Sequence, residues 1–206
     1  MPAIQLFSTP FSGHCHRVTL LLNMLNLPFE VKDAPADVRQ SAEFLRLNPL
    51  GQIPVLVDDG HAITDSNAIL VYLVKRYAPD SHWLSEDPLK AAEVQKWLSR
   101  VAGEVRFGPA SARMVKQFSA PESLESALAV TAKFLPQLEL HVETHEFLAT
   151  ERATIADLAC YAYVATAPEG GISLAQYPAI QRWLRRIESL PGFTPLPALP
   201  LPEDKK

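Results

Sequence analysis

Residues 48–73 read NPLGQIPVLVDDGHAITDSNAILVYL, and this stretch decides the fold. Residues 48–51 favour a turn, because proline fixes φ and glycine supplies a positive φ. The apolar, β-branched run from Ile53 to Val57 predicts a short strand. Asp58-Asp59-Gly60 predicts a hairpin into a second strand. The cluster Thr64-Asp65-Ser66-Asn67 then predicts a helix N-terminus.

Two features of this stretch indicate more than a plain hairpin. Pro54 starts a strand, where its missing N–H needs an edge or a bulge, so Ile53-Pro54 is a candidate cis peptide bond. Asp65 and Ser66 at a helix start bring a carboxylate, a hydroxyl and unpaired N–H groups together. A small peptide could be held there, with its backbone on Ile53, its ammonium on Asp65 and its carboxylate on Ser66. The alternative is an ordinary turn followed by an ordinary cap.

The order of these two motifs is also informative. G-x-I-P-V-L at residues 51–56, followed by D-S-x-A-I at 65–69, resembles the glutathione transferase family. The resemblance implies a cis Pro54, and it implies that Asp65 and Ser66 serve the γ-glutamyl end of glutathione. Gln52 and Ile53 would hold the cysteinyl backbone. Arg39 would lie near the glycyl end, unless it is a solvated surface arginine.

Composition narrows the class of protein. With 206 residues, 48% hydrophobic and 20% charged, the chain fits a globular protein that can bury a sizeable core. The net charge of −4 gives no electrostatic footprint for nucleic acid, and no apolar run approaches membrane-spanning length. The first ten residues do not form a secretory signal. We therefore expect a cytoplasmic protein that binds neither nucleic acid nor membrane.

Cysteines and histidines indicate neither a disulfide framework nor a metal site. Cys15 and Cys160 are too few for such a framework, and no Cys-x-x-Cys occurs. Cys160 lies in an apolar run and is expected to be buried. The six histidines lack ligand spacing, since His14 and His16 would point to different faces of a helix. We predict no metal.

Residues 1–78 predict an α/β thioredoxin-like domain. A βαβ unit with parallel strands and a right-handed crossover is expected first, and a helix at 42–47 then leads into the hairpin and its helix. The unit consists of a strand at 4–7, a helix at 14–25 and a strand at 29–31.

After a linker at 78–86 the strand signals stop, which predicts an all-helical domain over 87–194. Its first helix starts at Asp87-Pro88 and should break or kink at Gly108-Pro109. A helix over roughly 122–147 should kink or end at Pro136. The segment 195–206 is proline-rich and then charged, and is expected to be an irregular or mobile tail.

Thr154-Ile155-Ala156-Asp157 predicts a capping box at the start of the most apolar helix. Both groups would be buried, so losing Asp157 should cost roughly 1–3 kcal/mol. The T-I-A-D pattern is a second point of resemblance to the same family, where it is structural. The family often has Gly before this box, whereas this chain has Glu151-Arg152-Ala153, so that loop is expected to differ in shape.

The chemistry would depend on the thiol of glutathione, whose ordinary pKa of about 8.5 leaves it mostly protonated at neutral pH. A hydroxyl at the N-terminus of the first helix would favour the thiolate by hydrogen bond and dipole. Residues 12–18 read SGHCHRV, and S-G-x-C-x-(R/K)-V is similar to the serine-type bacterial and related classes, which implies Ser12. Many of those have Asn at the position of His14, so His14 is another candidate donor, as are Ser8 and Thr9.

Cys15 is the rival of Ser12. Near a helix N-terminus, with Arg17 and two histidines close by, its thiol pKa could be lowered. That would suit mixed-disulfide chemistry, as in the cysteine-type classes. The alternative for Cys15 is a packed, inert residue on the inner face of the helix.

The electrophile pocket would lie between the domains, formed by Phe11 and by the helix that carries Arg106 and Arg113. The resemblance implies a cytoplasmic glutathione transferase that directs the glutathione thiolate at a hydrophobic electrophile. It also implies a homodimer that pairs unlike domains. A glutathione-dependent disulfide or peroxide reductase, and a non-catalytic glutathione-binding module with the same fold, are the alternatives.

Overall fold

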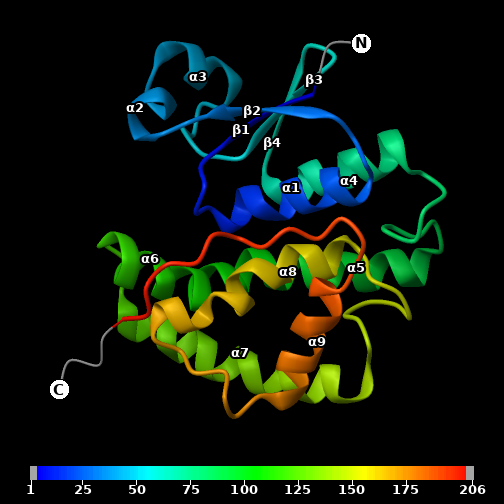
Figure 1. Cartoon of the computed structure of the whole chain (residues 1–206), viewed down its shortest axis with the longest axis vertical. Coiled ribbons are helices and arrows are strands. Elements are labelled where there is room, and N and C mark those ends of the chain that lie inside the picture. Colours follow the sequence, from blue (N-terminus) through cyan, green and yellow to red (C-terminus); the bar gives the residue numbers. More distant parts are fainter. Residues whose placement is uncertain (1–3, 203–206) are drawn as a thin grey trace.

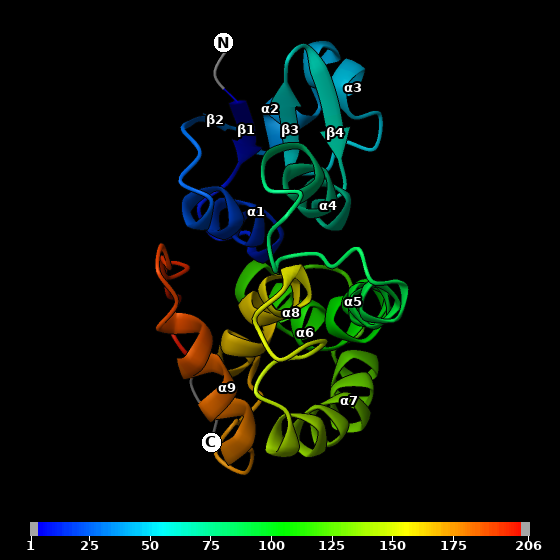
Figure 2. The ribbon, with the colours of Figure 1, turned by 90° about the vertical axis from the view of Figure 1, so that its right-hand side faces the viewer.

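The computed structural model describes residues 4–202. Figure 2 shows two stacked parts, a sheet with helices above and a layer of helices below. Helices α1 (Gly13–Met24) and α4 (Ser66–Tyr77) of the upper part pack on α8 (Ile155–Ala165) of the lower part. The upper part comprises β1 (Ile4–Ser8), α1 (Gly13–Met24), β2 (Phe29–Asp33), α2 (Ala36–Arg39), α3 (Ala42–Leu47), β3 (Val55–Asp58), β4 (His61–Thr64) and α4 (Ser66–Tyr77).

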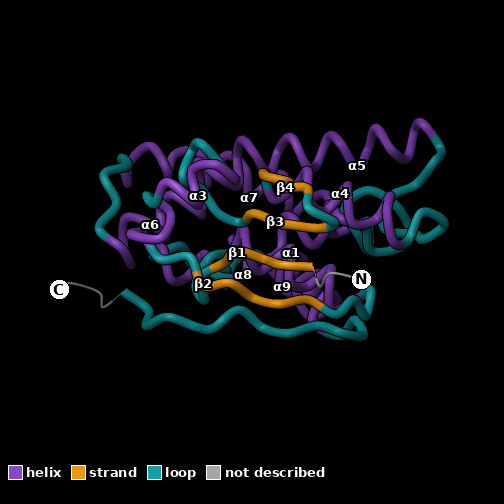
Figure 3. The backbone as a smooth tube through the Cα atoms, turned by 90° about the horizontal axis from the view of Figure 1, so that it is seen from above, coloured by secondary structure: helices purple, strands orange, loops and turns teal. Residues whose placement is uncertain are grey.

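The sheet has the strand order β2-β1-β3-β4, which Figure 3 shows from above. β1 and β2 are parallel, which confirms the predicted βαβ unit, and the other two pairings are antiparallel. Because side chains alternate along a strand, Leu6 enters the main core with α1 and α4. Phe7 instead packs edge-to-face on Phe44 of α3, with 5.7 Å between ring centroids. The strands and helices therefore form the expected thioredoxin-like arrangement.

The loop from Asn48 to Pro54 has the predicted turn and the predicted cis bond at Ile53-Pro54. Gly51 has φ +62, a conformation that favours glycine. The buried Asn48 side chain orders the loop from within. Its Nδ2 donates to the Gln52 carbonyl at 2.8 Å, and its Oδ1 accepts from the Leu50 N–H at 3.2 Å. The backbone around Ile53 is thereby held in one shape.

Among the described residues, the lower part contains helices and no strand. The predicted kink at Gly108 is confirmed, with φ −97 and ψ −106, and a Cβ there would lie 2.9 Å from Thr131 Oγ1 of the adjoining helix. Of the kink or boundary expected at Pro136, the boundary is wrong, because α7 (Leu124–Thr144) continues through that residue. The elements are α5 (Pro88–Arg100), a π-helical segment η1 (Val101–Ala110), α6 (Ser111–Phe118), α7 (Leu124–Thr144), α8 (Ile155–Ala165), the 3-10 turn η2 (Ala167–Gly170) and α9 (Pro178–Glu188).

The predicted capping box at the start of α8 is present. Asp157 Oδ2 accepts from the Thr154 N–H at 2.9 Å, and Thr154 Oγ1 accepts from the Ala156 N–H at 3.3 Å. Asp157 Oδ1 also accepts from the Leu148 N–H and the Trp183 indole N–H, at 2.9 and 3.0 Å. One buried carboxylate therefore joins α8, α9 and the preceding loop.

The described end of the chain, residues 194–202, is irregular as predicted, but it is hydrogen-bonded at both ends. His16 Nε2 lies 2.7 Å from the Thr194 carbonyl, and Asn23 Nδ2 donates to Thr194 Oγ1 at 3.2 Å. Further on, Gln117 Nε2 donates to the Pro200 carbonyl at 2.9 Å. Figure 1 shows this segment in red, crossing below α1 toward α6. The tail therefore bridges the two parts of the molecule.

Candidate active site

A cleft of about 280 Å³ lies where the two parts meet. Its upper wall comes from α1, the loop before β3 and the start of α4, and its lower wall comes from η1. A second cavity of about 550 Å³ shares His14, Gln52, Ile53 and Arg106 with the cleft, so the two adjoin. The predicted Gln52, Ile53, Pro54, Asp65 and Ser66 all line the first cleft.

Asp65 is held in a strained conformation at the mouth of the cleft. Its backbone has φ +68 and ψ 123, which is rare for a residue other than glycine and costs about 1–3 kcal/mol. Its Oδ1 accepts from the N–H groups of Asn67 and Ala68, both at 2.9 Å. Both bonds use one oxygen, so Oδ2 can face a ligand's ammonium group.

Ser66 is buried one residue further on, at the N-terminus of α4. Its Oγ accepts from Arg17 Nη1 of α1 at 3.1 Å, and the same nitrogen donates to Asn67 Oδ1 at 2.9 Å. Sequence reasoning considered Arg17 only as a neighbour of Cys15. Its spacing from the buried Gly13 and Leu21 on one helix face is the signal that it points inward.

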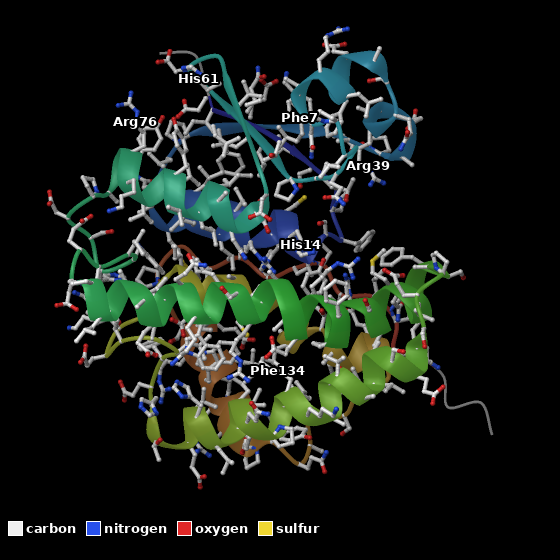
Figure 4. All side chains as sticks on the ribbon, turned by 180° about the vertical axis from the view of Figure 1, so that it is seen from behind. Phe7, His14, Arg39, His61, Arg76 and Phe134 are labelled. Carbon is white, nitrogen blue, oxygen red and sulfur yellow. The ribbon has the colours of Figure 1, made fainter. Side chains whose placement is uncertain are left out.

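His14 lies between Ser66 and the lower part, and Figure 4 shows it where the two parts meet. Its Nδ1 is 3.5 Å from Ser66 Oγ, and its ring packs edge-to-face on Tyr163 of α8. Burial, followed by the charges of Arg17 and Arg106, lowers the pKa of His14 well below 6.5. The imidazole is therefore neutral at pH 7.

Ser12 is the N-cap of α1, and its Oγ accepts from the Cys15 N–H at 3.2 Å. It lines the larger cavity together with Thr9 and Ile53. A hydroxyl has a single proton, so an oxygen that accepts a backbone N–H keeps that proton for another acceptor. Ser12 can thus donate a hydrogen bond to an anion in the cavity, at a helix N-terminus that also favours negative charge.

Cys15 is buried, with only 1% of its area exposed. Burial raises the pKa of its thiol, and this effect outweighs the opposing influence of the neighbouring polar groups and of the Arg17 charge. The lowered pKa considered from sequence is therefore wrong. Cys160 is also buried, as predicted, and burial raises the pKa of its thiol to about 12.

The structure brings together two of the three residues expected to form an electrophile pocket. Phe11 and Arg106 do line the larger cavity, along with Met114 of α6. Arg113 does not, because it is 1% exposed and its Nε donates to Glu169 at 2.6 Å inside the lower part. Helical periodicity alone could not show that Glu169 of η2 faces Arg113.

Arg113 has a different role. Its Nη1 donates to the Phe11 carbonyl at 2.8 Å, which ties the loop between β1 and α1 to α6.

Comparisons with known proteins match most of the chain to one family. The chain matches family models described as Glutathione S-transferase, N-terminal domain, over residues 6–81, and Glutathione S-transferase, C-terminal domain, over residues 103–191. It is 30% identical to glutathione S-transferase 3 of Zea mays, over 98% of this chain and 97% of that protein.

Two solved structures are similar over most of their length. A glutathione S-transferase from Xanthobacter autotrophicus Py2 has a TM-score of 0.87 and 32% identity, over 95% of this chain and 97% of that chain. A glutathione transferase homolog from Drosophila mojavensis, with bound glutathione, has a TM-score of 0.83 and 26% identity, over 93% and 90%. The chain belongs to the glutathione S-transferase family.

As a glutathione transferase, the enzyme uses glutathione as its co-substrate. Transfer chemistry is favoured over the reductase and the non-catalytic alternatives. Residues 4–202 contain no group of three or more His, Cys, Asp or Glu side chains placed to hold a metal ion. In the same part of the chain, no helix combines the length and the apolar character needed to cross a membrane.

Arg39 of α2 lies on the upper rim of this transferase's larger cavity, and Figure 4 shows it on the sheet side of His14. It is partly buried. Between Arg39 and Asp65, the two adjoining cavities offer a basic group at one end and an acidic group at the other.

Proposed function

We propose that the enzyme binds glutathione along this cleft and that the Ser12 hydroxyl stabilises its thiolate. The γ-glutamyl end would lie at Asp65 and Ser66, the cysteinyl backbone on Ile53 and Gln52, and the glycyl end toward Arg39. The observation that carries the proposal is the direction of the hydrogen bond at Ser12. Its oxygen accepts from the Cys15 N–H, and its side chain lines the cavity beside Ile53.

Two other features support this choice of donor. The neutral His14 adjoins Ser12 in the same cavity and can serve as a further neutral donor. The buried Cys15, with its raised pKa, does not provide the thiolate that a mixed-disulfide mechanism requires. The sulfur that reacts would therefore be that of glutathione.

The acceptor of the glutathione sulfur would be a hydrophobic electrophile in the larger cavity. Phe11, Met114 and Phe118 give that cavity an apolar side, and Tyr163 closes it toward the lower part. Arg106 gives the same cavity one cationic side chain, held by Ser111 at 2.9 Å and Glu122 at 3.3 Å. Both reactants would then meet next to Ser12.

The test is a comparison of Ser12→Ala with Ser8→Ala in a chromogenic conjugation assay. Ser8 is a matched control, since it is a buried serine whose hydroxyl donates to the Thr9 carbonyl. Ser12→Ala should raise the pKa of bound glutathione by about one unit or more, and each unit corresponds to roughly tenfold less thiolate at neutral pH. Turnover should fall accordingly and recover in part at high pH, while glutathione affinity stays nearly constant.

The titration is followed by the thiolate absorbance of bound glutathione. An unshifted pKa in Ser12→Ala, or an equal loss of turnover in Ser8→Ala, would remove Ser12 from the proposed role.

We also propose that the enzyme is a homodimer that works in the cytoplasm and divides at residues 78–87 into a glutathione-binding and a helical domain. Family resemblance supports the dimer, and exposed apolar side chains such as Leu50 and Leu89 would suit an interface. Sedimentation at micromolar concentration should show twice the 22.8 kDa mass of the chain. A stable monomer would contradict the dimer and leave the proposed chemistry standing.

A further inference from the structure

Arg17 is the most deeply buried charge beside the cleft. It is 1% exposed, as is Arg113, but the two differ in their partners. Arg113 is paired with Glu169 at 2.6 Å, whereas no carboxylate of residues 4–202 lies within ion-pair distance of Arg17. Its Nε and Nη2 also have no hydrogen-bond partner in that range. A buried charge without a counter-charge is costly, so a folded protein retains one mainly where something compensates it.

The one bonded nitrogen of Arg17 determines what Ser66 can do. A guanidinium can only donate, so Ser66 Oγ must be the acceptor in the 3.1 Å contact with Nη1. The hydroxyl proton of Ser66 is thereby left for an acceptor on the cleft side, where His14 Nδ1 lies 3.5 Å from Ser66 Oγ. Arg17 therefore makes Ser66 a preorganised hydrogen-bond donor, and a ligand carboxylate needs such a donor because it can only accept.

Asn67 fixes this arrangement in place. Its Oδ1 accepts from the same Arg17 nitrogen at 2.9 Å, and its Nδ2 donates to the Leu98 carbonyl of α5 at 3.2 Å. The guanidinium is therefore bound by two residues of α4, Ser66 and Asn67, and Asn67 is itself bonded to the lower part. Being fixed and shielded from water, its charge acts on a nearby anion with little screening.

We propose that Arg17 is a positioning residue and the counter-charge for the α-carboxylate of the γ-glutamyl group, acting through the Ser66 hydroxyl. This inference rests on the proposed function, which places that group at Asp65 and Ser66. The zwitterionic end of glutathione would then meet two charges of opposite sign, an exposed carboxylate at Asp65 and a buried guanidinium at Arg17. The pair makes the site specific for an amino acid terminus.

A purely structural role makes a different prediction, because Arg17 also connects α1 to α4. Loss of that connection would weaken every ligand of the cleft equally. Loss of a counter-charge would instead weaken the binding of only those ligands that carry the α-carboxylate. Ligands that differ by that one group therefore separate the two readings.

The test measures the affinity of three peptides by calorimetry: glutathione, 4-aminobutanoyl-Cys-Gly, which lacks the α-carboxylate, and glutaryl-Cys-Gly, which lacks the ammonium. Arg17→Met should weaken glutathione and the glutaryl peptide about tenfold or more, and the 4-aminobutanoyl peptide less than about twofold. Arg17→Lys keeps the charge and should retain part of the preference for the carboxylate-bearing peptides. It serves as the second variant if Arg17→Met folds poorly. Arg76→Met, an exposed arginine of α4, is the control and should change none of the three.

The outcomes distinguish failure of the role of Arg17 from failure of the proposed glutathione site. Equal weakening of all three peptides in both Arg17 variants would overturn the role of Arg17 and leave the glutathione site intact. If the wild-type enzyme binds glutathione and the 4-aminobutanoyl peptide equally well, the carboxylate is not recognised, and the placement of the γ-glutamyl end fails with it. Selective loss for the two carboxylate-bearing peptides supports the inference.

Discussion

Asp65 is the residue at which binding and folding can be separated most sharply. Its Oδ1 caps α4 through two N–H groups, and its other oxygen is proposed to meet the ammonium of glutathione. Asp65→Ala removes both functions. Asp65→Asn keeps a side-chain oxygen for the two N–H groups and removes only the charge.

The two variants should therefore differ in stability and agree in binding. Loss of a cap costs about 0.5–2 kcal/mol, and about 1 kcal/mol shifts Tm by roughly 2–4 °C in a chain of this size. Asp65→Ala should thus lower Tm by up to about 8 °C, and Asp65→Asn by less than about 2 °C. Removing a charged hydrogen-bond partner costs about 1.5–3 kcal/mol, so both should bind glutathione roughly ten- to a hundredfold more weakly.

The assays are scanning calorimetry of the free protein and titration calorimetry with glutathione. An Asp65→Asn variant that binds glutathione as tightly as the wild type would refute the reasoning. Asp65 would then be a helix cap and nothing more, and its strained backbone would need another explanation.

Three further predictions follow from buried groups. Cys15→Ala should keep conjugation turnover within about twofold, since the buried thiol is not the attacking sulfur, and abolished activity would point to a mixed-disulfide enzyme. His14 and His16 both have pKa values lowered chiefly by burial, so below about pH 6.5 the unfolded chain takes up protons that the folded chain does not. Urea unfolding should show stability falling by about 1.4 kcal/mol per pH unit for each histidine that stays neutral, and equal stability at pH 7 and 5 would contradict this. Asp157→Ala leaves three buried N–H groups without their acceptor and should destabilise the fold by about 3 kcal/mol or more in the same assay, whereas a loss below about 1 kcal/mol would disprove its role as a junction.

Local signals predicted much of the upper part. The strand before Asp58, the hairpin, the cap at Asp65 and the cis Pro54 all depend on neighbouring residues, and all are present. The single helical turn α2 was missed because four residues show no periodicity. The π-helical segment η1 was also missed. Its sequence signalled the break at Gly108 but not the change of hydrogen bonding before it, which depends on packing.

The site was predictable where the chain itself brings residues together and uncertain where packing does so. Asp65 and Ser66 adjoin along the chain, and the cis bond adjoins Gln52. Arg17 and Arg113 could not be placed in the same way. Each is an arginine on a helix, and only its partner on a neighbouring element decides its role. Arg17 donates to Ser66 beside the cleft, whereas Arg113 donates to Glu169 inside the lower part.

The tail from Thr194 bears on how the enzyme admits its substrates. The chain passes between the two parts once through the linker before α5, and the tail adds a second connection through its hydrogen bonds to His16 and Asn23. A hinge rotation that opened the cleft would have to break those bonds. We therefore expect no open and closed forms, and structures solved with and without glutathione should superpose with the same angle between the parts. Discrimination among electrophiles would then depend on side chains such as Phe11 and Met114 changing rotamers in a preformed cavity, on the nanosecond timescale of side chains and not the slower one of domains.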